Sequence, residues 1–331
     1  MKAPEILLLT RSDVAALLGL EECIAAVEHA FRLYGQGRTA QPGVLSHQTR
    51  DGGFHIKAAS LELGCHYFAA KTNGNFSRNP ERFGLPAIQG LILLCDAERG
   101  SPLALMDSIE ITVLRSGAAT AVAAKYLARP DARVATICGC GNQGRIQLRS
   151  LLAMCPLKRI FAWDIDPERS ERFATELSAA LNLAVEPAGV VGAAVRQSDI
   201  CVTCTPSRKF FLRARDVAPG TFVAAVGADN VDKQELEPEL LARAKLVVDI
   251  LEQCATIGEL HHALEKGCMA RSSVYAELGE IAGGRKPGRT SREEITIFDS
   301  TGTALQDVAA AAIVYERALA QGRGTRLDFA V

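Results

Sequence analysis

One short run of residues in this sequence has the types and spacing to hold the phosphates of a nucleotide. The run Gly139-Cys140-Gly141-Asn142-Gln143-Gly144 follows a strand-like stretch, Val134–Cys138, and opens a stretch with helical character. The first glycine permits a tight turn, the second lets the backbone approach a pyrophosphate, and the third permits close packing of helix on strand. The start of a helix also attracts negative charge. The run therefore predicts a dinucleotide site formed by Gly139, Gly141, Asn142, Gln143 and Gly144.

An acidic residue after the next strand-like stretch indicates which dinucleotide this site would bind. Asp164 follows Arg159–Trp163 and stands about 25 residues beyond the first glycine. A carboxylate there accepts hydrogen bonds from the adenosine ribose hydroxyls and repels a 2′-phosphate, so we predict NAD rather than NADP. The alternative is that Asp164 or Asp166 only caps the helix that begins at Pro167.

The overall composition limits the classes of function. With 331 residues, of which 48% are hydrophobic, the chain is long enough for about two domains. Because 37 Lys and Arg balance 38 Asp and Glu, the chain lacks the positive charge that nonspecific nucleic-acid binding requires. The apolar run Ile6–Leu9 is too short to span a bilayer and has no signal-peptide flanks. We therefore expect a cytoplasmic protein with neither nucleic-acid nor membrane partners.

Two patterns look like metal or redox motifs, but a structural role explains them better. Cys201-Val202-Thr203-Cys204 has CxxC spacing, yet a strand points alternate residues to opposite faces and no second pair follows. The chain has ten cysteines, and four of them, Cys138, Cys140, Cys201 and Cys204, lie in apolar, strand-like stretches. Without a secretion signal, we expect them to be reduced, small core residues. The adjacent pair His261-His262 cannot direct both rings to one helical face. We therefore expect no metal.

The elements that must position the nucleotide turn can be read from hydrophobic periodicity. Apolar residues recur at helical spacing over Ser12–Gly35, where Ser12 and Asp13 could cap a helix. Between Val44 and Leu105, short β-rich runs separated by Gly, Asn, Pro and Asp predict a mostly antiparallel sheet. The alanine-rich stretch Thr112–Leu127 predicts a helix, which ends at Arg129-Pro130-Asp131. A domain boundary is expected within or beside this helix.

After this helix the pattern changes to alternating strands and helices. Strands are expected at Val134–Cys138, Arg159–Trp163, Ile200–Cys204, Thr221–Val226 and Leu246–Asp249, with helices at Gln143–Met154 and Pro167–Leu181. Buried β-rich runs between helices are typical of a parallel, doubly wound sheet of the Rossmann type. A last strand, Ile295–Ser300, precedes an apolar helix, Ala304–Leu319, which we expect to pack back on the first domain.

Four stretches together are similar to the ornithine cyclodeaminase and mu-crystallin family, and the likeness runs from the first helix to the final one. They are Ala70-Lys71-Thr72-Asn73, Met106-Asp107-Ser108 with Thr112–Ala119, the turn Gly139–Gly144, and Val226-Gly227-Ala228-Asp229 with Lys233–Leu236. The resemblance implies an α/β fold in which a Rossmann domain joins an α+β domain for substrate binding and dimerisation. We expect the first of these at 116–304 and the second at 1–115 with 305–331.

The resemblance also implies roles for three charged residues. Residues at the positions of Lys71 and Arg115 grip the substrate α-carboxylate in the family, and two cations can orient such a carboxylate. By themselves, Lys71 and Arg115 would be read as solvated surface charges. Asp229 matches a carboxylate that handles protons on the substrate amines in cyclodeaminases. Ketimine reductases of the mu-crystallin type have a serine at this position. The structural alternative for Asp229 is a turn after a strand.

Other positions match the family more weakly, and some depart from it. Lys233, Thr203, Thr205 and Ser300 resemble cofactor-site residues, and Gln89 is expected to face the substrate. Where many members have an arginine, this chain has Val44, and their Met-Pro pair is Lys57-Ala58 here. Our hypothesis is that Lys57 supplies the missing cation from a neighbouring strand.

The resemblance implies an NAD-dependent enzyme and leaves three functions open. The first is cyclodeamination, in which transient oxidation at the α-carbon converts L-ornithine to L-proline plus ammonia. The second is net redox chemistry, as in amino-acid dehydrogenases and reductases of pyrroline- or piperideine-2-carboxylate. The third is nucleotide binding with little turnover. A carboxylate that handles protons, at Asp229, argues against this third function. The family also implies a homodimer formed through the domain that does not bind the nucleotide.

Overall fold

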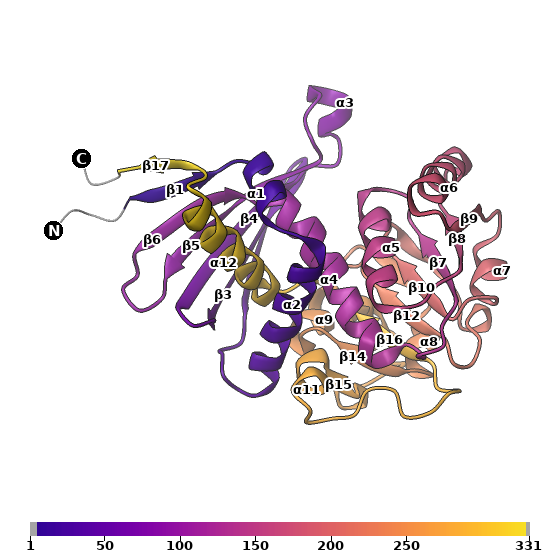
Figure 1. Cartoon of the computed structure of the whole chain (residues 1–331). Coiled ribbons are helices and arrows are strands. Elements are labelled where there is room, and N and C mark those ends of the chain that lie inside the picture. Colours follow the sequence, from indigo (N-terminus) through magenta and orange to yellow (C-terminus); the bar gives the residue numbers. More distant parts are fainter. Residues whose placement is uncertain (1–4, 329–331) are drawn as a thin grey trace. The chain divides into compact units, whose positions relative to one another are not determined.

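A computed structural model describes residues 5–328 of the chain. The described residues form two compact units. Unit 1 contains the residues up to Arg115 together with those from Thr303 onward, and unit 2 is Ser116–Gly302. Each unit has its own main sheet (Figure 1). The two ends of the chain therefore combine in one unit, and the middle of the chain forms the other.

Unit 1 is built on a seven-stranded sheet in the order β17-β1-β6-β5-β4-β3-β2. Neighbouring strands are antiparallel except for β1 and β6, which run parallel. The strands are β1 (Ile6–Leu9), β2 (Gly43–Thr49), β3 (Gly52–Glu62), β4 (His66–Asn75), β5 (Ile88–Asp96), β6 (Pro102–Asp107) and β17 (Thr325–Leu327). In β4, buried Tyr67, Ala69 and Lys71 alternate with more exposed residues, as expected for a sheet with one covered face.

Helices cover one face of this sheet, which we call the inner face. The helices of unit 1 are α1 (Arg11–Leu17), α2 (Leu20–Gly35), α3 (Asn79–Phe83), α12 (Ala304–Gln321) and the start of α4 (Ile109–Leu127). The hydroxyl of Thr303 caps α12, and its alanine-rich body is almost wholly buried. Small side chains let α12 contact α2, β3 and β4 closely, and Figure 1 shows it lying over the sheet.

The expectation of one helix over Ser12–Gly35 is wrong. The segment forms two helices that are separated at Leu18 and Gly19, both of which have extended backbones. The first helix is capped by Thr10 rather than Ser12, in a capping box with Asp13. Apolar periodicity continued through the break because both helices bury one face, so the pattern alone did not reveal the interruption.

Unit 2 is a doubly wound sheet of eight parallel strands in the order β15-β14-β16-β12-β10-β7-β8-β9. The strands are β7 (Val134–Cys138), β8 (Arg159–Trp163), β9 (Ala184–Pro187), β10 (Ile200–Thr203), β12 (Phe222–Ala225), β14 (Lys245–Val248), β15 (Ala276–Glu277) and β16 (Thr296–Asp299). The order β9-β8-β7-β10-β12 is the 3-2-1-4-5 part of a Rossmann fold, and β16, the last strand of this sheet along the chain, occupies the place next to β12. The expected fold class is confirmed: a Rossmann-type unit together with an α+β unit.

The connections of unit 2 are mostly helical, as parallel strands require. They include α5 (Asn142–Met154), α6 (Pro167–Leu181), α7 (Val191–Val195), α8 (Pro238–Ala242), α9 (Leu251–Ile257), α10 (Glu259–Glu265), α11 (Leu278–Ala282) and the remainder of α4, with 3₁₀ turns at Ala214–Asp216 and Arg271–Ser273. A second, two-stranded parallel sheet pairs β11 (Arg208–Leu212) with β13 (Gln234–Leu236). Within the described residues, none of the helices has the length and apolar composition that a bilayer crossing requires.

Candidate functional site

The glycine-rich turn connects β7 to α5, and its three glycines have different surroundings. Gly139 has a φ of +106°, which disfavours side chains, and a Cβ on it would lie 2.9 Å from the carbonyl oxygen of Cys204. A Cβ on Gly144 would lie 2.1 Å from the carbonyl oxygen of Gly139. A Cβ on Gly141 would meet nothing within 4 Å. The turn is thus closed where helix and strand pack and open where a pyrophosphate would approach.

The N-terminus of α5 meets the second requirement for an anion site. Its N-cap is Gly141, so no side chain caps the first N–H groups. Asn142 is exposed at the first helical position. In the part of the chain that the structure describes, the buried Oε1 atom of Gln143 has no hydrogen-bond partner. Uncapped N–H groups beside open space are what a phosphate group uses at a helix start, so the turn fits a dinucleotide.

Asp164 lies directly after β8, and its carboxylate is oriented by backbone groups. Its Oδ2 atom accepts the N–H of Cys140 at 2.8 Å, and its Oδ1 atom accepts the N–H of Asp166 at 3.1 Å. Asp166, not Asp164, is the N-cap of α6, because it accepts the N–H of Glu168. The helix-capping alternative therefore applies to Asp166. Asp164 instead ties the end of β8 to the glycine-rich turn.

Three other predicted cofactor residues lie at the ends of strands of the same sheet or directly after them. Thr203 ends β10 and is wholly buried, while Thr205 follows it and donates its hydroxyl to Glu235. Ser300 follows β16 and is buried. Because the carboxyl ends of parallel strands share one edge of a sheet, Thr205 and Ser300 belong to the edge where Rossmann folds bind ligands.

Asp229 lies beyond β12 at this same edge. The ammonium Nζ of Lys233 is 2.6 Å from its Oδ1 atom, and 46% of the Asp229 side chain is exposed. The two predicted residues are therefore brought together as an ion pair on one short loop. The exposed fraction leaves the carboxylate accessible, as a group that exchanges protons must be.

Unit 1 brings together three cationic side chains on the inner face of its sheet, and we call Lys57, Lys71 and Arg115 the cationic cluster. They are only 7%, 3% and 7% exposed. Asp307 of α12 forms ion pairs with two of them, at 2.8 Å from Lys71 Nζ and 3.3 Å from Arg115 Nε. Arg115 also donates to Gln306 Oε1 at 2.9 Å. Buried cations are rare in proteins unless they are paired or used.

The cationic cluster changes the pKa of Lys71. Burial lowers the pKa of its ammonium group to about 7, because removal from water outweighs the attraction of Asp307, and the positive charges of Arg115 and Lys57 lower the pKa further. The buried amide nitrogen of Gln306 has no hydrogen-bond partner among the described residues. An unused donor beside clustered cations is the chemistry of a site for a carboxylate.

Sheet register explains how Lys57 joins this cluster. Val44 is the cross-strand partner of Lys57, and Lys57 is in turn the partner of Lys71, so the three residues form one row on the inner face. Val44, the position at which many family members have an arginine, is therefore a direct neighbour of Lys57. This register supports the hypothesis that Lys57, on the adjacent strand, supplies the positive charge that the arginine supplies in other members.

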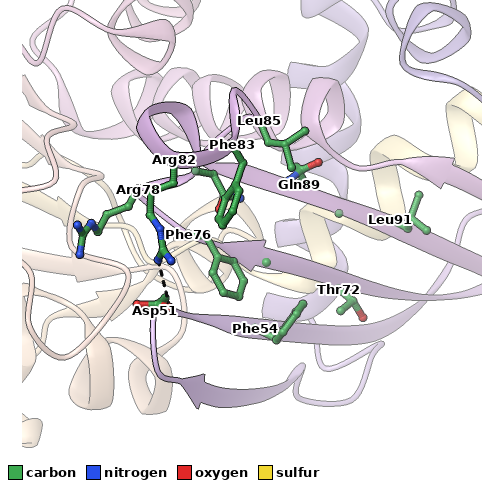
Figure 2. Close-up of a pocket in the computed structure, with 13 residues that line it drawn as sticks. Asp51, Phe54, Thr72, Phe76, Arg78, Arg82, Phe83, Leu85, Gln89 and Leu91 are labelled. Atoms are coloured by element: carbon green, nitrogen blue, oxygen red, sulfur yellow. Dashed lines mark ion pairs between the residues drawn. The ribbon is translucent and has the colours of Figure 1, made fainter.

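Gln89 is not brought together with the cationic cluster. It pairs with Gly74, whereas Ile92 pairs with Lys71, so Gln89 lies on the opposite, outer face of the sheet. There it lines a cavity of about 700 Å³ together with Phe54, Leu91 and the segment of α3. Figure 2 shows this cavity with its aromatic side chains and the ion pair between Arg82 and Asp51, which are 3.2 Å apart.

No sequence motif pointed to Gln306, Asp307 or Glu235 as site residues. Gln306 and Asp307 are the only polar residues in the first eleven residues of α12, so two polar residues in an apolar run were a usable signal. Glu235 lay inside a quoted stretch, but its burial could not be read from the sequence. Among the described residues, one group could hold a metal: ligand atoms of His261, His262 and Glu265 on α10 lie within 4.8 Å of one another, so the expectation that the two adjacent rings cannot come together is wrong. The Cys201 and Cys204 thiols are free.

Comparisons with known proteins agree with this architecture. A model of the ornithine cyclodeaminase/mu-crystallin family matches residues 5–322. The alanine dehydrogenase of Archaeoglobus fulgidus is 40% identical over 326 residues, which are 98% of this chain and 99% of that protein. The iminosuccinate reductase of Paracoccus denitrificans is 32% identical over 325 residues, which are 96% of this chain and 98% of that protein.

Solved structures give the same result. The archaeal alanine dehydrogenase dimer with bound NAD has a TM-score of 0.94 at 40% identity, over 98% of this chain and 99% of that one. The Δ1-pyrroline-2-carboxylate reductase of Thermococcus litoralis, in complex with NADH and L-proline, has a TM-score of 0.91 at 34% identity, over 97% and 99% of the two chains. The protein therefore belongs to the ornithine cyclodeaminase/mu-crystallin family.

Proposed function

We propose that the protein is an NAD-dependent oxidoreductase that interconverts a small 2-imino acid and the corresponding L-amino acid. The observation that carries this proposal is the buried cationic cluster of Lys57, Lys71 and Arg115, in which the carboxylate of Asp307 pairs with Lys71 and Arg115. The turn Gly139–Gly144 supplies the cofactor site of the proposal. NAD, rather than NADP, is supported by Asp164 and by the relatives solved with NAD or NADH.

Substrate anchoring is assigned to the cationic cluster. Arg115 presents a fixed guanidinium beside Gln306, and the unused amide N–H of Gln306 adds a neutral donor. Together with Lys57 they attract a carboxylate and fix its orientation, which sets the position of the adjacent α-carbon. Asp307 holds Lys71 and Arg115 in place when no substrate is bound. It also reduces the excess of buried positive charge.

Proton transfer is assigned to Lys71. A pKa of about 7 lets this amine exist in both forms near neutral pH, which is the condition for efficient general acid–base catalysis. When bound, the reduced nicotinamide supplies the hydride that the imine carbon accepts. The ammonium form of Lys71 gives one proton to the imine nitrogen, so one hydride and one proton convert C=N into CH–NH. The amine form of Lys71 takes that proton back in the oxidative direction.

Cyclodeamination of L-ornithine is the second candidate, and Asp229 is the observation that favours it. The carboxylate of Asp229 pairs with Lys233, and 46% of the Asp229 side chain is exposed. Such a group can accept protons from a second substrate amine, which net redox chemistry on alanine or proline does not require. The relatives described as alanine dehydrogenase and pyrroline-2-carboxylate reductase favour the net redox reaction.

A homodimer is part of the proposal. The outer face of the unit 1 sheet exposes large apolar side chains, with Leu45 61%, Phe54 40%, Leu91 48% and Leu93 37% exposed. The edge strand β2 is exposed along its whole length. Apolar faces and open strand edges mark association surfaces, and the archaeal relative is a dimer. A second copy of this chain is the occupant we propose.

The experiment is a substrate panel. Alanine, proline, ornithine and lysine would be tested with NAD+ and NADP+, and pyruvate plus ammonia, pyrroline-2-carboxylate and piperideine-2-carboxylate with NADH and NADPH, with product identification. We expect stoichiometric oxidation of NADH by at least one imino acid. Proline and ammonia from ornithine, without net change in NADH, would instead establish the cyclodeaminase. Tight NADH binding without turnover of any compound would contradict both and favour a nucleotide-binding role.

A further inference from the structure

A buried glutamate joins two strand ends at the ligand-binding edge of unit 2. Glu235 lies on β13 and is 0% exposed. Its Oε1 atom accepts the N–H and the hydroxyl of Thr205, at 2.6 and 2.7 Å. Its Oε2 atom accepts the N–H of Gly227 at 2.9 Å. One carboxylate therefore connects the loop that follows β10 with the loop that follows β12.

The glycines beside these bonds are closely packed. A Cβ on Gly227 would lie 2.5 Å from the carboxylate of Glu235. On the other side, a Cβ on Gly139 would lie 3.1 Å from the side chain of Thr205. The loop that Glu235 holds is thus in close contact with the glycine-rich turn. The Gly227 loop leads directly to Asp229.

Glu235 is itself fixed by further buried carboxylates. Its own N–H donates to Glu259 Oε1 at 2.6 Å, and the N–H of Leu236 donates to Glu259 Oε2 at 3.2 Å. The N–H groups of Glu259 and Leu260 donate in turn to Asp299, at 3.2 and 2.9 Å. Among the described residues, no ion pair involves Glu235, Glu259 or Asp299. Burial raises the pKa of Glu235, and its hydrogen bonds from Thr205 and Gly227 oppose that rise.

We propose that Glu235 is a positioning residue for the nicotinamide half of the cofactor. In a Rossmann fold the first three strands serve the adenosine half, and the fourth and fifth serve the other half. Here β7, β8 and β9 carry Gly139–Gly144 and Asp164, whereas β10 and β12 carry the two loops that Glu235 joins. Loss of this carboxylate should therefore loosen mainly the nicotinamide half, because Asp164 still holds the glycine-rich turn through the N–H of Cys140. This inference rests on the proposed NAD site.

The test compares two ligands in the variant Glu235→Gln, whose amide can accept N–H groups at only one of its two positions. Trp163 is the only tryptophan, and its carbonyl accepts the N–H of Gly139 at 2.8 Å, so quenching of its emission reports NADH binding. We expect the Kd for NADH to rise at least about tenfold. We expect the Kd for AMP, measured by calorimetry, to stay within about twofold of the wild-type value.

The control is Glu237→Gln. Glu237 is two residues away and also accepts a loop N–H, that of Ala214 at 2.7 Å, but it joins no strand end of the main sheet. We expect it to leave both affinities unchanged. If Glu235→Gln does not fold, Glu235→Asp, which keeps both oxygens on a shorter arm, is measured in the same way.

The outcomes separate this inference from the proposed function. If the wild-type protein does not bind NADH, the proposed cofactor site fails. If the wild type binds NADH and the folded Glu235 variant binds it equally well, or loses AMP and NADH affinity in the same proportion, Glu235 is not a positioning residue for the nicotinamide half. A selective loss for NADH, absent in Glu237→Gln, supports it.

Discussion

At the scale of single residues, the chemistry depends on how Lys71 is charged. Two neighbours of the same sign, Arg115 and Lys57, and one of the opposite sign, Asp307, surround its amine in a buried place. Burial is the largest of these influences and brings the pKa to about 7. A lysine in water would be almost fully charged at neutral pH. The surroundings thus convert a permanent cation into a group that can give and take a proton.

The pH dependence of the reaction should follow Lys71. In the direction of imine reduction the ammonium form is needed, so kcat should fall as pH rises through about 7. In the oxidative direction the amine form is needed, so kcat should rise over the same interval. Lys71→Arg, which stays charged, should lower kcat by about 100-fold or more and remove the inflection. Steady-state kinetics in both directions measure this. An unchanged inflection in Lys71→Arg would assign it to another group.

Lys57 should contribute to substrate affinity. Replacement of Lys57 by Met keeps the length of the side chain but removes one cation beside the proposed carboxylate site, so KM for the amino or imino acid should rise at least about tenfold. The inflection of Lys71 should also move to higher pH, because the charge of Lys57 lowers the pKa of Lys71. Lys57→Arg is the matched control, which keeps the charge. Unchanged KM in Lys57→Met would show that Lys57 has no part in binding.

At the scale of elements, the cofactor site depends on how a strand becomes a helix. The turn from β7 to α5 needs three glycines for three different reasons, of which only the open space at Gly141 concerns the ligand directly. Asp164 fixes the same turn from β8 through the N–H of Cys140. On the other side of β7, the loop after β10 contacts Gly139. The turn is therefore held from both neighbouring strands.

Two alanine substitutions should separate ligand binding from folding at this turn. Gly141→Ala adds a methyl group where no atom lies within 4 Å, so the melting temperature should stay the same while the Kd for NADH rises at least about tenfold. Gly144→Ala places a Cβ against the carbonyl oxygen of Gly139, so the free energy of unfolding should drop by about 1–3 kcal/mol. Thermal unfolding without ligand and NADH titration measure the two effects. Equal losses of stability in both variants would contradict the assignment.

At the scale of the whole molecule, the two faces of the unit 1 sheet differ in character. Its inner face carries the cationic cluster and is covered by α12, which lies about 230 residues from β4 in the sequence. Its outer face carries the exposed apolar residues and the cavity in Figure 2. Because strand residues alternate between faces, neighbouring positions such as Lys71 and Thr72 lie on opposite faces. This alternation would let one sheet carry both the proposed substrate site and the proposed association surface.

The dimer should respond to a charge on the outer face. Leu91→Asp places a carboxylate among Phe54, Leu93 and their neighbours, so burial against a second copy would be costly and the protein should become monomeric. Light scattering after size-exclusion chromatography gives the mass. Leu319→Asp is the control, because Leu319 is exposed to a similar degree, 43% against 48%, but lies on α12. If Leu91→Asp stays dimeric, the outer face is not the interface.

The sequence by itself determined the Rossmann unit, because glycine spacing, strand-to-helix alternation and an acid after the second strand are all local patterns. It could also suggest Lys71, Arg115 and Asp229, through a likeness spread over the chain. Only the tertiary structure decided which charges meet. Asp307 reaches Lys71 and Arg115 across more than 190 residues, Lys57 joins them through sheet register, and Gln89 turns to the other face. Burial and cross-strand pairing are made by residues distant in sequence, so no local pattern contains the altered pKa of Lys71 or the bonds of Glu235.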